Sequence, residues 1–138
     1  MTTTDKYSVT MITETIFRLK MAEGMEMELE DVIQVRSTFL NYSKGKKFMV
    51  LFDANNFFSI SPEARELIAS EEYTRDRVAT AFVTDQLSGR LLCNFFIKYN
   101  RPATPTKVFT DESSAYSWLQ AQMEKAQITD AKKTKMDA

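Results

Sequence analysis

The sequence contains no histidine, a single cysteine and only three glycines in its 138 residues. Without histidine the chain lacks the commonest general base, which excludes Ser-His and Cys-His nucleophile pairs and most zinc sites. The three glycines, Gly24, Gly45 and Gly89, do not fall in a dinucleotide-binding or phosphate-loop spacing. We therefore expect a protein that is not an enzyme and that holds no cofactor and no metal.

Strong net charge and long apolar runs are also missing. The formal net charge is −1, so no global field attracts nucleic acid or an anionic membrane. No stretch approaches the ~18 continuous apolar residues of a membrane span, and the N-terminus does not read as a signal peptide. Cys93 has no second cysteine to pair with, which indicates a reducing compartment. These observations predict a cytoplasmic protein with no nucleic-acid or membrane partner.

Hydrophobic periodicity predicts five strands. Alternating residues indicate an N-terminal hairpin of half-buried strands, Tyr7–Met11 and Phe17–Met21. Lys47–Phe52 and Val78–Val83 are continuously apolar instead, which is typical of parallel strands covered on both faces. Lys107–Phe109 is a further short strand.

Helical spacing predicts four helices. The first two run from Leu29 to about Ser43 and from Pro62 to near Tyr73. The third runs from Leu87 to Tyr99 and has a broad apolar face (Leu91, Leu92, Phe95, Phe96). The fourth begins at an N-cap, Thr110, and has a buried stripe (Ala115, Trp118, Leu119, Met123). Strands that alternate with helices pair in parallel through crossovers. The expected fold is α/β, with a mixed sheet of about five strands, an antiparallel N-terminal hairpin and about four helices. Residues 1–124 form one domain, and the polar segment 125–138 is expected to be a disordered tail.

Polar side chains gather in the loops that follow the predicted parallel strands, where open α/β sheets bind ligands. The candidate contacts for a partner or ligand are Asp53, Asn55, Asn56, Phe57, Phe58, Ser59 and Asp85. Asp53 and Asp85 are carboxylates of the kind that bind Mg²⁺ or serve acid–base chemistry, but ordinary loop roles are the favoured interpretation because no third ligand accompanies them. For the adjacent aromatics, packing of both in the core is favoured over exposure of one of them to a partner.

Ser61 stands directly before Pro62, at the start of the second predicted helix. This position predicts a helix N-cap. Ser61 is also the candidate regulatory phosphosite, because a phosphate there would meet free helix N–H groups and the positive end of the helix dipole. The two roles are compatible. Cys93, by contrast, is expected to be a buried structural thiol.

Three segments carry a family resemblance: ELEDVIQ (Glu28–Gln34), KKFMVLFDANNFFSISPEARELIA (Lys46–Ala69) and the stretch from Ala79 to Leu119 that contains GRLLCNFF and VFTDESSAYSWL. Over roughly residues 7–122 the chain resembles an uncharacterised subgroup of bacterial SpoIIAA-like domains, which are related to the STAS domains of anti-sigma-factor antagonists. The resemblance implies a SpoIIAA-like or STAS-like fold. In the antagonists a partner kinase phosphorylates a serine at the position of Ser61, although Ile60 and Pro62 depart from the antagonists' motif.

The resemblance, together with the missing catalytic residues, favours a non-enzymatic regulatory module that binds another protein through the loop and helix around Phe57–Ser70. The alternative is a domain that binds a small apolar or nucleotide ligand in a pocket at the carboxyl ends of the parallel strands. A homodimer formed through the edge of the N-terminal hairpin is a further interpretation.

Overall fold

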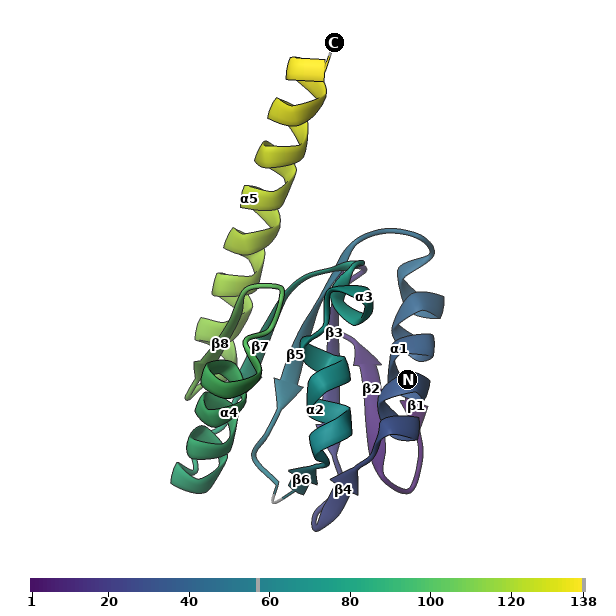
Figure 1. Cartoon of the computed structure of the whole chain (residues 1–138), viewed down its shortest axis with the longest axis vertical. Helices are drawn as coiled ribbons and strands as arrows, with labels where there is room; N and C mark the ends of the chain where they lie inside the picture. The colour runs from purple at the N-terminus through teal and green to yellow at the C-terminus, as the bar shows by residue number, and fades with distance from the viewer. Residues whose placement is uncertain (57, 138) are drawn as a thin grey trace.

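A computed structural model describes residues 1–56 and 58–137 and shows a mixed sheet between helices (Figure 1). Within this part of the chain the main sheet has six strands in the order β1-β2-β3-β5-β7-β8. They are β1 (Thr2–Thr3), β2 (Tyr7–Met11), β3 (Ile16–Met21), β5 (Phe48–Asp53), β7 (Arg77–Val83) and β8 (Thr106–Phe109). The first three pair antiparallel, and the pairs from β3 to β8 are parallel. This confirms the predicted α/β class and mixed pairing.

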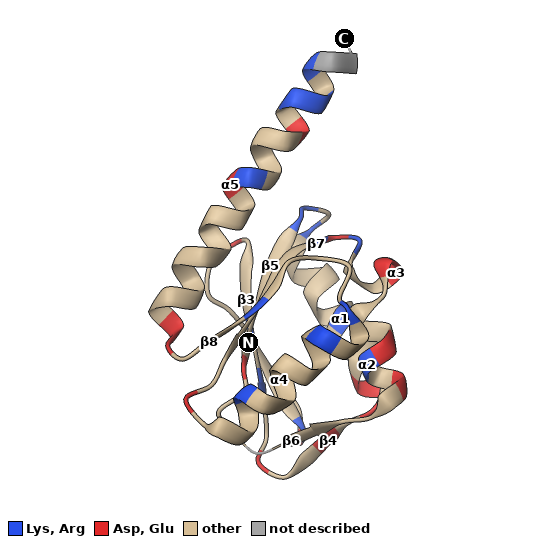
Figure 2. Cartoon of the chain, turned by 60° about the vertical axis from the view of Figure 1, so that its left-hand side comes forward, with Lys and Arg blue, Asp and Glu red and all other residues tan. Residues whose placement is uncertain are grey.

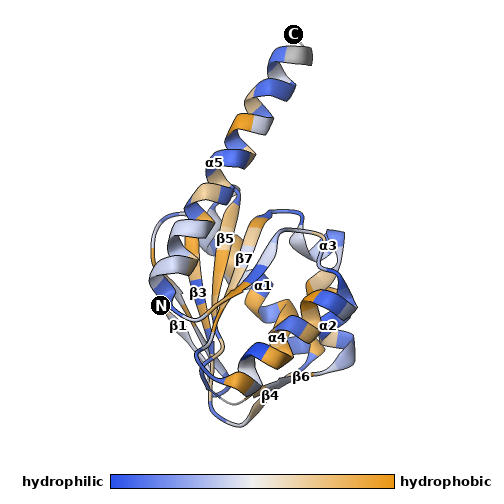
Figure 3. Ribbon diagram, turned by 90° about the vertical axis from the view of Figure 1, so that its left-hand side faces the viewer, coloured by the Kyte–Doolittle hydropathy of each residue, from blue (hydrophilic) through white to orange (hydrophobic). Residues whose placement is uncertain are grey.

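Helices cover both faces of the sheet. They are α1 (Leu29–Ser43), α2 (Pro62–Ala69), α3 (Glu71–Thr74), α4 (Leu87–Asn100) and α5 (Glu112–Asp137). Figure 3 shows α5 on one side of the sheet and α1, α2, α3 and α4 on the other. Every helix in the described residues is too short or too polar to cross a bilayer.

Strand β5 explains why helices cover both faces of the sheet. Its apolar run does not alternate, so side chains on both faces are apolar: Phe48, Val50 and Phe52 join the core under α1, α2 and α4, whereas Met49 and Leu51 join the core under α5. All five are at most 5% exposed. The continuous apolar run therefore predicted its environment correctly.

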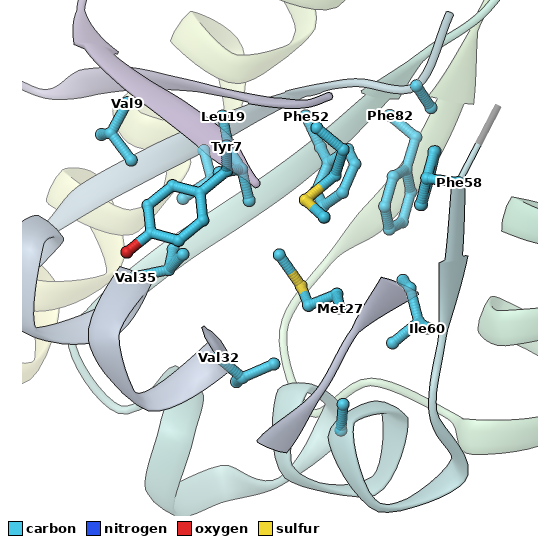
Figure 4. Close-up of a cluster of buried hydrophobic side chains, with 14 of the residues drawn as sticks. Tyr7, Val9, Leu19, Met27, Val32, Val35, Phe52, Phe58, Ile60 and Phe82 are labelled. Atoms are coloured by element: carbon cyan, nitrogen blue, oxygen red, sulfur yellow. The ribbon is translucent and has the colours of Figure 1, made fainter. Parts of the chain in front are cut away.

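A small parallel sheet of β4 (Met25–Met27) and β6 (Phe58–Ile60) closes one end of the larger core. Met27 and Ile60 point from these strands into the cluster that Phe52 and Phe82 also enter (Figure 4). The sequence predicted neither strand, because each has three residues and its partner lies more than thirty residues away along the chain.

Three boundaries differ from the sequence predictions. The main sheet has a sixth strand, since β1 pairs with β2 along the hairpin edge that was expected to be free. The helix expected from Pro62 to near Tyr73 divides at Ser70, whose extended backbone ends α2 and whose hydroxyl accepts a hydrogen bond from the Tyr73 N–H to begin α3. The N-cap of α5 is Asp111 and not Thr110. The Asp111 carboxylate accepts hydrogen bonds from the backbone N–H of Ser114 at 2.7 Å and from the Ser114 hydroxyl at 2.8 Å. These two bonds lower the pKa of Asp111.

The segment 125–138, expected to be a disordered tail, instead continues α5 to Asp137. The physical reason lies in its composition: it contains no glycine or proline and is rich in alanine and lysine, which are strong helix formers. Side chains from 127 to 135 are all exposed, and the helix projects away from the sheet (Figure 1). Periodicity failed here because this part of the helix buries no face.

Candidate functional site

The polar residues predicted to form a site do lie together, but they bind one another. Strands β5 and β7 end side by side, with Asp53 in register with Val83. The Asp53 carboxylate accepts hydrogen bonds from the backbone N–H of Asn55 at 3.1 Å and from its side-chain amide at 2.9 Å. The Asn55 amide oxygen in turn accepts from the Asp85 N–H at 3.1 Å. These bonds fasten the two loops together.

This arrangement fits the loop roles predicted for the two aspartates. Asp53 is linked to the backbone of Asp85 through Asn55, with its oxygen directed at amide donors. Among the described residues, no group of three or more acidic or cysteine side chains could hold a metal ion. The geometry therefore carries no argument for a Mg²⁺ site at this edge.

The remaining loop candidates also serve structure. The Asn56 side-chain amide donates to the Met21 carbonyl at 3.0 Å, and the Ser59 hydroxyl donates to the Glu26 carboxylate at 3.3 Å. Phe58 is only 5% exposed and its ring centroid lies 5.3 Å from that of Phe52, so it belongs to the core. Phe57, the other aromatic candidate, lies outside the described residues.

A hollow of about 250 Å³ opens at the carboxyl ends of the parallel strands, where the sequence placed a ligand pocket. Its described lining contains no titratable side chain and consists of Asn56, Phe58, Ser59, Gln86, Ser88, Gly89 and Leu92. Gln86 precedes the first turn of α4 and makes no side-chain cap to it. The hollow thus combines an apolar floor with amide and hydroxyl groups, and it offers neither an acid nor a base.

Gly89 sets the position of α4 beside this hollow. A Cβ atom at residue 89 would lie 2.5 Å from the Thr84 hydroxyl oxygen and 3.1 Å from the Ala54 carbonyl oxygen. Thr84 is fully buried, and its hydroxyl accepts from the Gln86 N–H at 3.2 Å. Only glycine therefore allows the start of α4 to come this close to the loops that follow β5 and β7.

Ser61 is the N-cap of α2, as the sequence predicted. Its hydroxyl accepts a hydrogen bond from the Ala64 N–H at 3.2 Å, and Pro62 occupies the first helical position. Its backbone N–H donates to the Met27 carbonyl at 3.0 Å, which ties the cap to β4. The Arg65 guanidinium donates to the Ile60 carbonyl at 2.7 Å, so a cation lies one turn from the hydroxyl.

Two buried groups away from the hollow are structural. Burial raises the pKa of the Cys93 thiol to about 12, which makes it inert, as predicted. Arg77 is also buried, and burial lowers its pKa. The rings of Tyr73 and Phe39 lie 5.0 and 5.4 Å from its guanidinium, and it donates to the Thr80 hydroxyl at 3.2 Å.

A larger groove, of about 530 Å³, lies between α1 and the α2–α3 segment. We call it the α1–α2 groove; it is lined by Ile33, Arg36, Ser37, Leu40, Asn41, Leu67, Glu72 and Tyr73. Ile33 is 55% exposed, and Arg36 lies across the groove, donating to the Tyr73 carbonyl at 3.3 Å. Sequence analysis missed the groove because it forms between two helices that are distant in the chain, whereas periodicity describes one helix at a time. Leu29, Val32, Ile33, Phe39 and Leu40 fit one ordinary apolar helix face, so their spacing gave no signal that Ile33 would be exposed.

Helix α4 differs from its prediction in the face that it buries. Leu91 and Phe95 were predicted to share one broad apolar face with Leu92 and Phe96, but they are 61% and 49% exposed, whereas Phe96 and Cys93 occupy the core. Leu87 and Tyr99 are also exposed, at 64% and 70%. An apolar helix face is therefore presented to solvent.

Comparison with known proteins assigns the fold but no activity. The sequence model of a domain of unknown function, DUF7793, matches residues 10–123. No curated protein matches the chain. The crystal structure of an uncharacterised protein of the DUF3478 family, with a SpoIIAA-like fold, from Shewanella loihica PV-4, aligns with a TM-score of 0.58 and 14% identity, over 86% of this chain and 98% of that one. At this identity the likeness shows the fold, which is SpoIIAA-like as the sequence predicted.

Proposed function

We propose that this chain, which belongs to the family of domains of unknown function DUF7793, is a non-enzymatic regulatory module that binds another protein in the α1–α2 groove. The observation that carries the proposal is the groove itself. It is the larger of the two hollows described above, and it combines the exposed Ile33 and the half-buried Leu40 and Leu67 with charged groups, Arg36 and Glu72. An apolar groove between two helices is a common receptor for an amphipathic helix.

The charges around the groove indicate the chemistry of the partner. Within Pro62–Thr74 the acidic residues Glu63, Glu66, Glu71 and Glu72 outnumber the single basic residue, Arg65. Figure 2 shows stretches of acidic residues, in red, on α2 and α3. A partner segment with apolar anchors flanked by lysine or arginine would complement this surface. We place the interaction in the cytoplasm, where a single reduced cysteine is the ordinary state.

Ser61 gives the proposal its regulatory part. Ser61 begins α2, and Leu67 of the same helix lines the groove. A phosphate on Ser61 would add negative charge to the helix that the partner contacts and would meet the helix N–H groups. The proposal therefore expects partner binding to differ between Ser61→Asp and Ser61→Ala.

The test is capture of a partner from the native cell lysate on the immobilised full chain. The wild type should retain a stoichiometric protein, and Ile33→Asp should lose it, because the charge would enter the apolar part of the groove. Ile128→Asp, which changes an apolar side chain of similar exposure (56%) on the distal part of α5, is the matched control and should retain the partner. If both Ile33→Asp and Ile128→Asp retain the partner, or if both lose it, the groove is not the binding site.

The hollow beside α4 supports a second candidate function, binding of a small apolar or nucleotide ligand. The specific observation is its mixed lining, in which Phe58 and Leu92 form an apolar floor below amide and hydroxyl groups. Native mass spectrometry of the purified protein should then show a bound small molecule. Ser88→Trp, which fills the hollow from its exposed side, should remove that mass. A ligand-free wild-type spectrum would contradict this second function and leave the first standing.

A further inference from the structure

We propose that the exposed face of α4 binds a second copy of this chain, in an antiparallel helix pair whose two-fold axis passes between Leu91 and Phe95. We call this face the α4 ridge; it consists of Leu87, Leu91, Phe95 and Tyr99. This goes beyond the proposed function, because the α1–α2 groove lies on the other side of α2, which packs between α1 and α4.

The α4 ridge is a continuous apolar surface. Its members are four residues apart, so they form one row along the helix, the kind of row that packs against another helix. They are 64%, 61%, 49% and 70% exposed in chain order. The rings of Phe95 and Tyr99 stack at 5.2 Å and 9°, and the Arg65 guanidinium lies 5.8 Å from the Phe95 ring. Scattered exposed apolar residues are ordinary, whereas a row of four large ones marks a contact surface.

The order of residues in the ridge makes it complementary to itself. The midpoint of the row is at the level of residue 93 along the helix axis: Leu91 and Phe95 lie two residues to either side of this level, and Leu87 and Tyr99 lie six. Two copies related by a two-fold axis at this point would bring Leu91 beside Phe95 of the second copy and Leu87 beside its Tyr99. Every contact along the row then joins an aliphatic side chain to an aromatic one. Such an isologous contact closes on itself and stops at two chains.

The charges at the two ends of α4 select the antiparallel orientation. Asp85 lies eight residues before the midpoint and Arg101 lies eight residues after it, and both are exposed. In the antiparallel pair Asp85 of each copy comes to the same level along the helix axes as Arg101 of the other, which has Lys98 within one turn. A parallel pair would place like charges together at both ends, which is unfavourable. Charge complementarity therefore points to a second copy as the occupant of the ridge.

The first test is the solution mass of the full chain by light scattering and sedimentation equilibrium. The wild type should have twice the monomer mass of 15.9 kDa. Leu91→Asp should shift the mass to that of the monomer, since it places a charge at the centre of the ridge. Ile33→Asp, in the α1–α2 groove, should remain dimeric. The proposal is overturned if the wild type is a monomer, or if the Leu91→Asp variant remains a dimer. It is also overturned if the wild type is a monomer whose ridge binds a different protein.

A charge exchange tests the orientation. Asp85→Arg and Arg101→Asp should each weaken the dimer at least tenfold, and the double variant should restore it because the pair forms again with reversed signs. Aspartate tolerates the left-handed backbone of Arg101 (φ 49°). A double variant as weak as the single ones overturns the antiparallel arrangement. Because Ile33→Asp reports on the groove and Leu91→Asp on the ridge, failure of the dimer and failure of the proposed function give different results.

Discussion

The Ser61 hydroxyl is committed to the first turn of α2, and this fixes what its substitution should do. Ser61→Ala removes the acceptor for the Ala64 N–H, so we expect a loss of about 1 kcal/mol in the free energy of unfolding. Ser61→Asp should retain the wild-type value, because aspartate is an equally good N-cap and its charge favours the helix dipole. Urea denaturation followed by circular dichroism measures both.

The matched control for Ser61 is Ser59→Ala, two residues earlier. Within the described residues the Ser59 hydroxyl hydrogen bonds the carboxylate of Glu26 at the surface, so its loss should change stability by less than about 0.5 kcal/mol. If Ser61→Ala and Ser59→Ala lowered the free energy of unfolding equally, the helix cap would make no specific contribution to stability.

The thiol of Cys93 should make stability depend on pH in alkaline solution. Its pKa is about 12 in the folded chain, against an ordinary value near 9 in the unfolded chain. Below pH 9 both states keep the proton; between pH 9 and 12 the unfolded state releases it first, so stability falls as pH rises. Up to about 1.4 kcal/mol is lost per pH unit. Urea titrations across this interval should show a shallower slope for Cys93→Ala, whatever its absolute stability, and parallel slopes would refute the assignment.

Single residues were predictable from sequence where a local rule governs them. Ser61 as a cap follows from the proline after it, and Cys93 as a buried structural thiol follows from its position within a helix and the absence of histidine. The hydrogen bond from the Asp85 N–H to Asn55 joins residues thirty apart, so only the folded structure brings them together. The sequence therefore predicted that the loop candidates lie close together, but it did not predict the hydrogen bonds between them.

Helix α5 has two parts with different expected contributions to stability. Leu119 is fully buried against the sheet, so Leu119→Ala should cost about 2–5 kcal/mol. Removal of residues 127–138 should change the free energy of unfolding by less than about 0.5 kcal/mol, because the described side chains from 127 to 135 are all exposed. Chemical denaturation of both variants measures this contrast, and a truncation as costly as Leu119→Ala would show that the distal part of α5 contacts the domain.

For the longer strands and helices, existence and type followed from periodicity, whereas the choice of buried face did not. Helix α4 was predicted from Leu87 to Tyr99 and runs from Leu87 to Asn100. Apolar residues occupy so much of its circumference that the sequence alone could not decide between Leu91 and Phe96 as the buried side. The close approach at Gly89 to Thr84 decides it, since it fixes the rotation of the helix over the sheet.

For the molecule as a whole, the order of strands and helices and the resemblance to SpoIIAA-like domains were sufficient to predict the fold, which the Shewanella loihica structure shares. The β4–β6 sheet and the α1–α2 groove were not predictable, because both depend on segments distant in sequence. Groove and ridge are thus properties of tertiary packing.

The coverage of one sheet face by α5 has a consequence for synthesis on the ribosome. Met49, Leu51, Ala79 and Ala81 face that side, and their cover, Ala115 and Leu119, is translated after every strand of the sheet. Translation at about 5–20 residues per second leaves this apolar face open for several seconds while the ribosome still holds α5. Nascent chains that stop before Glu112 should therefore be the ones that chaperones hold, and completion of the first turns of α5 should release them.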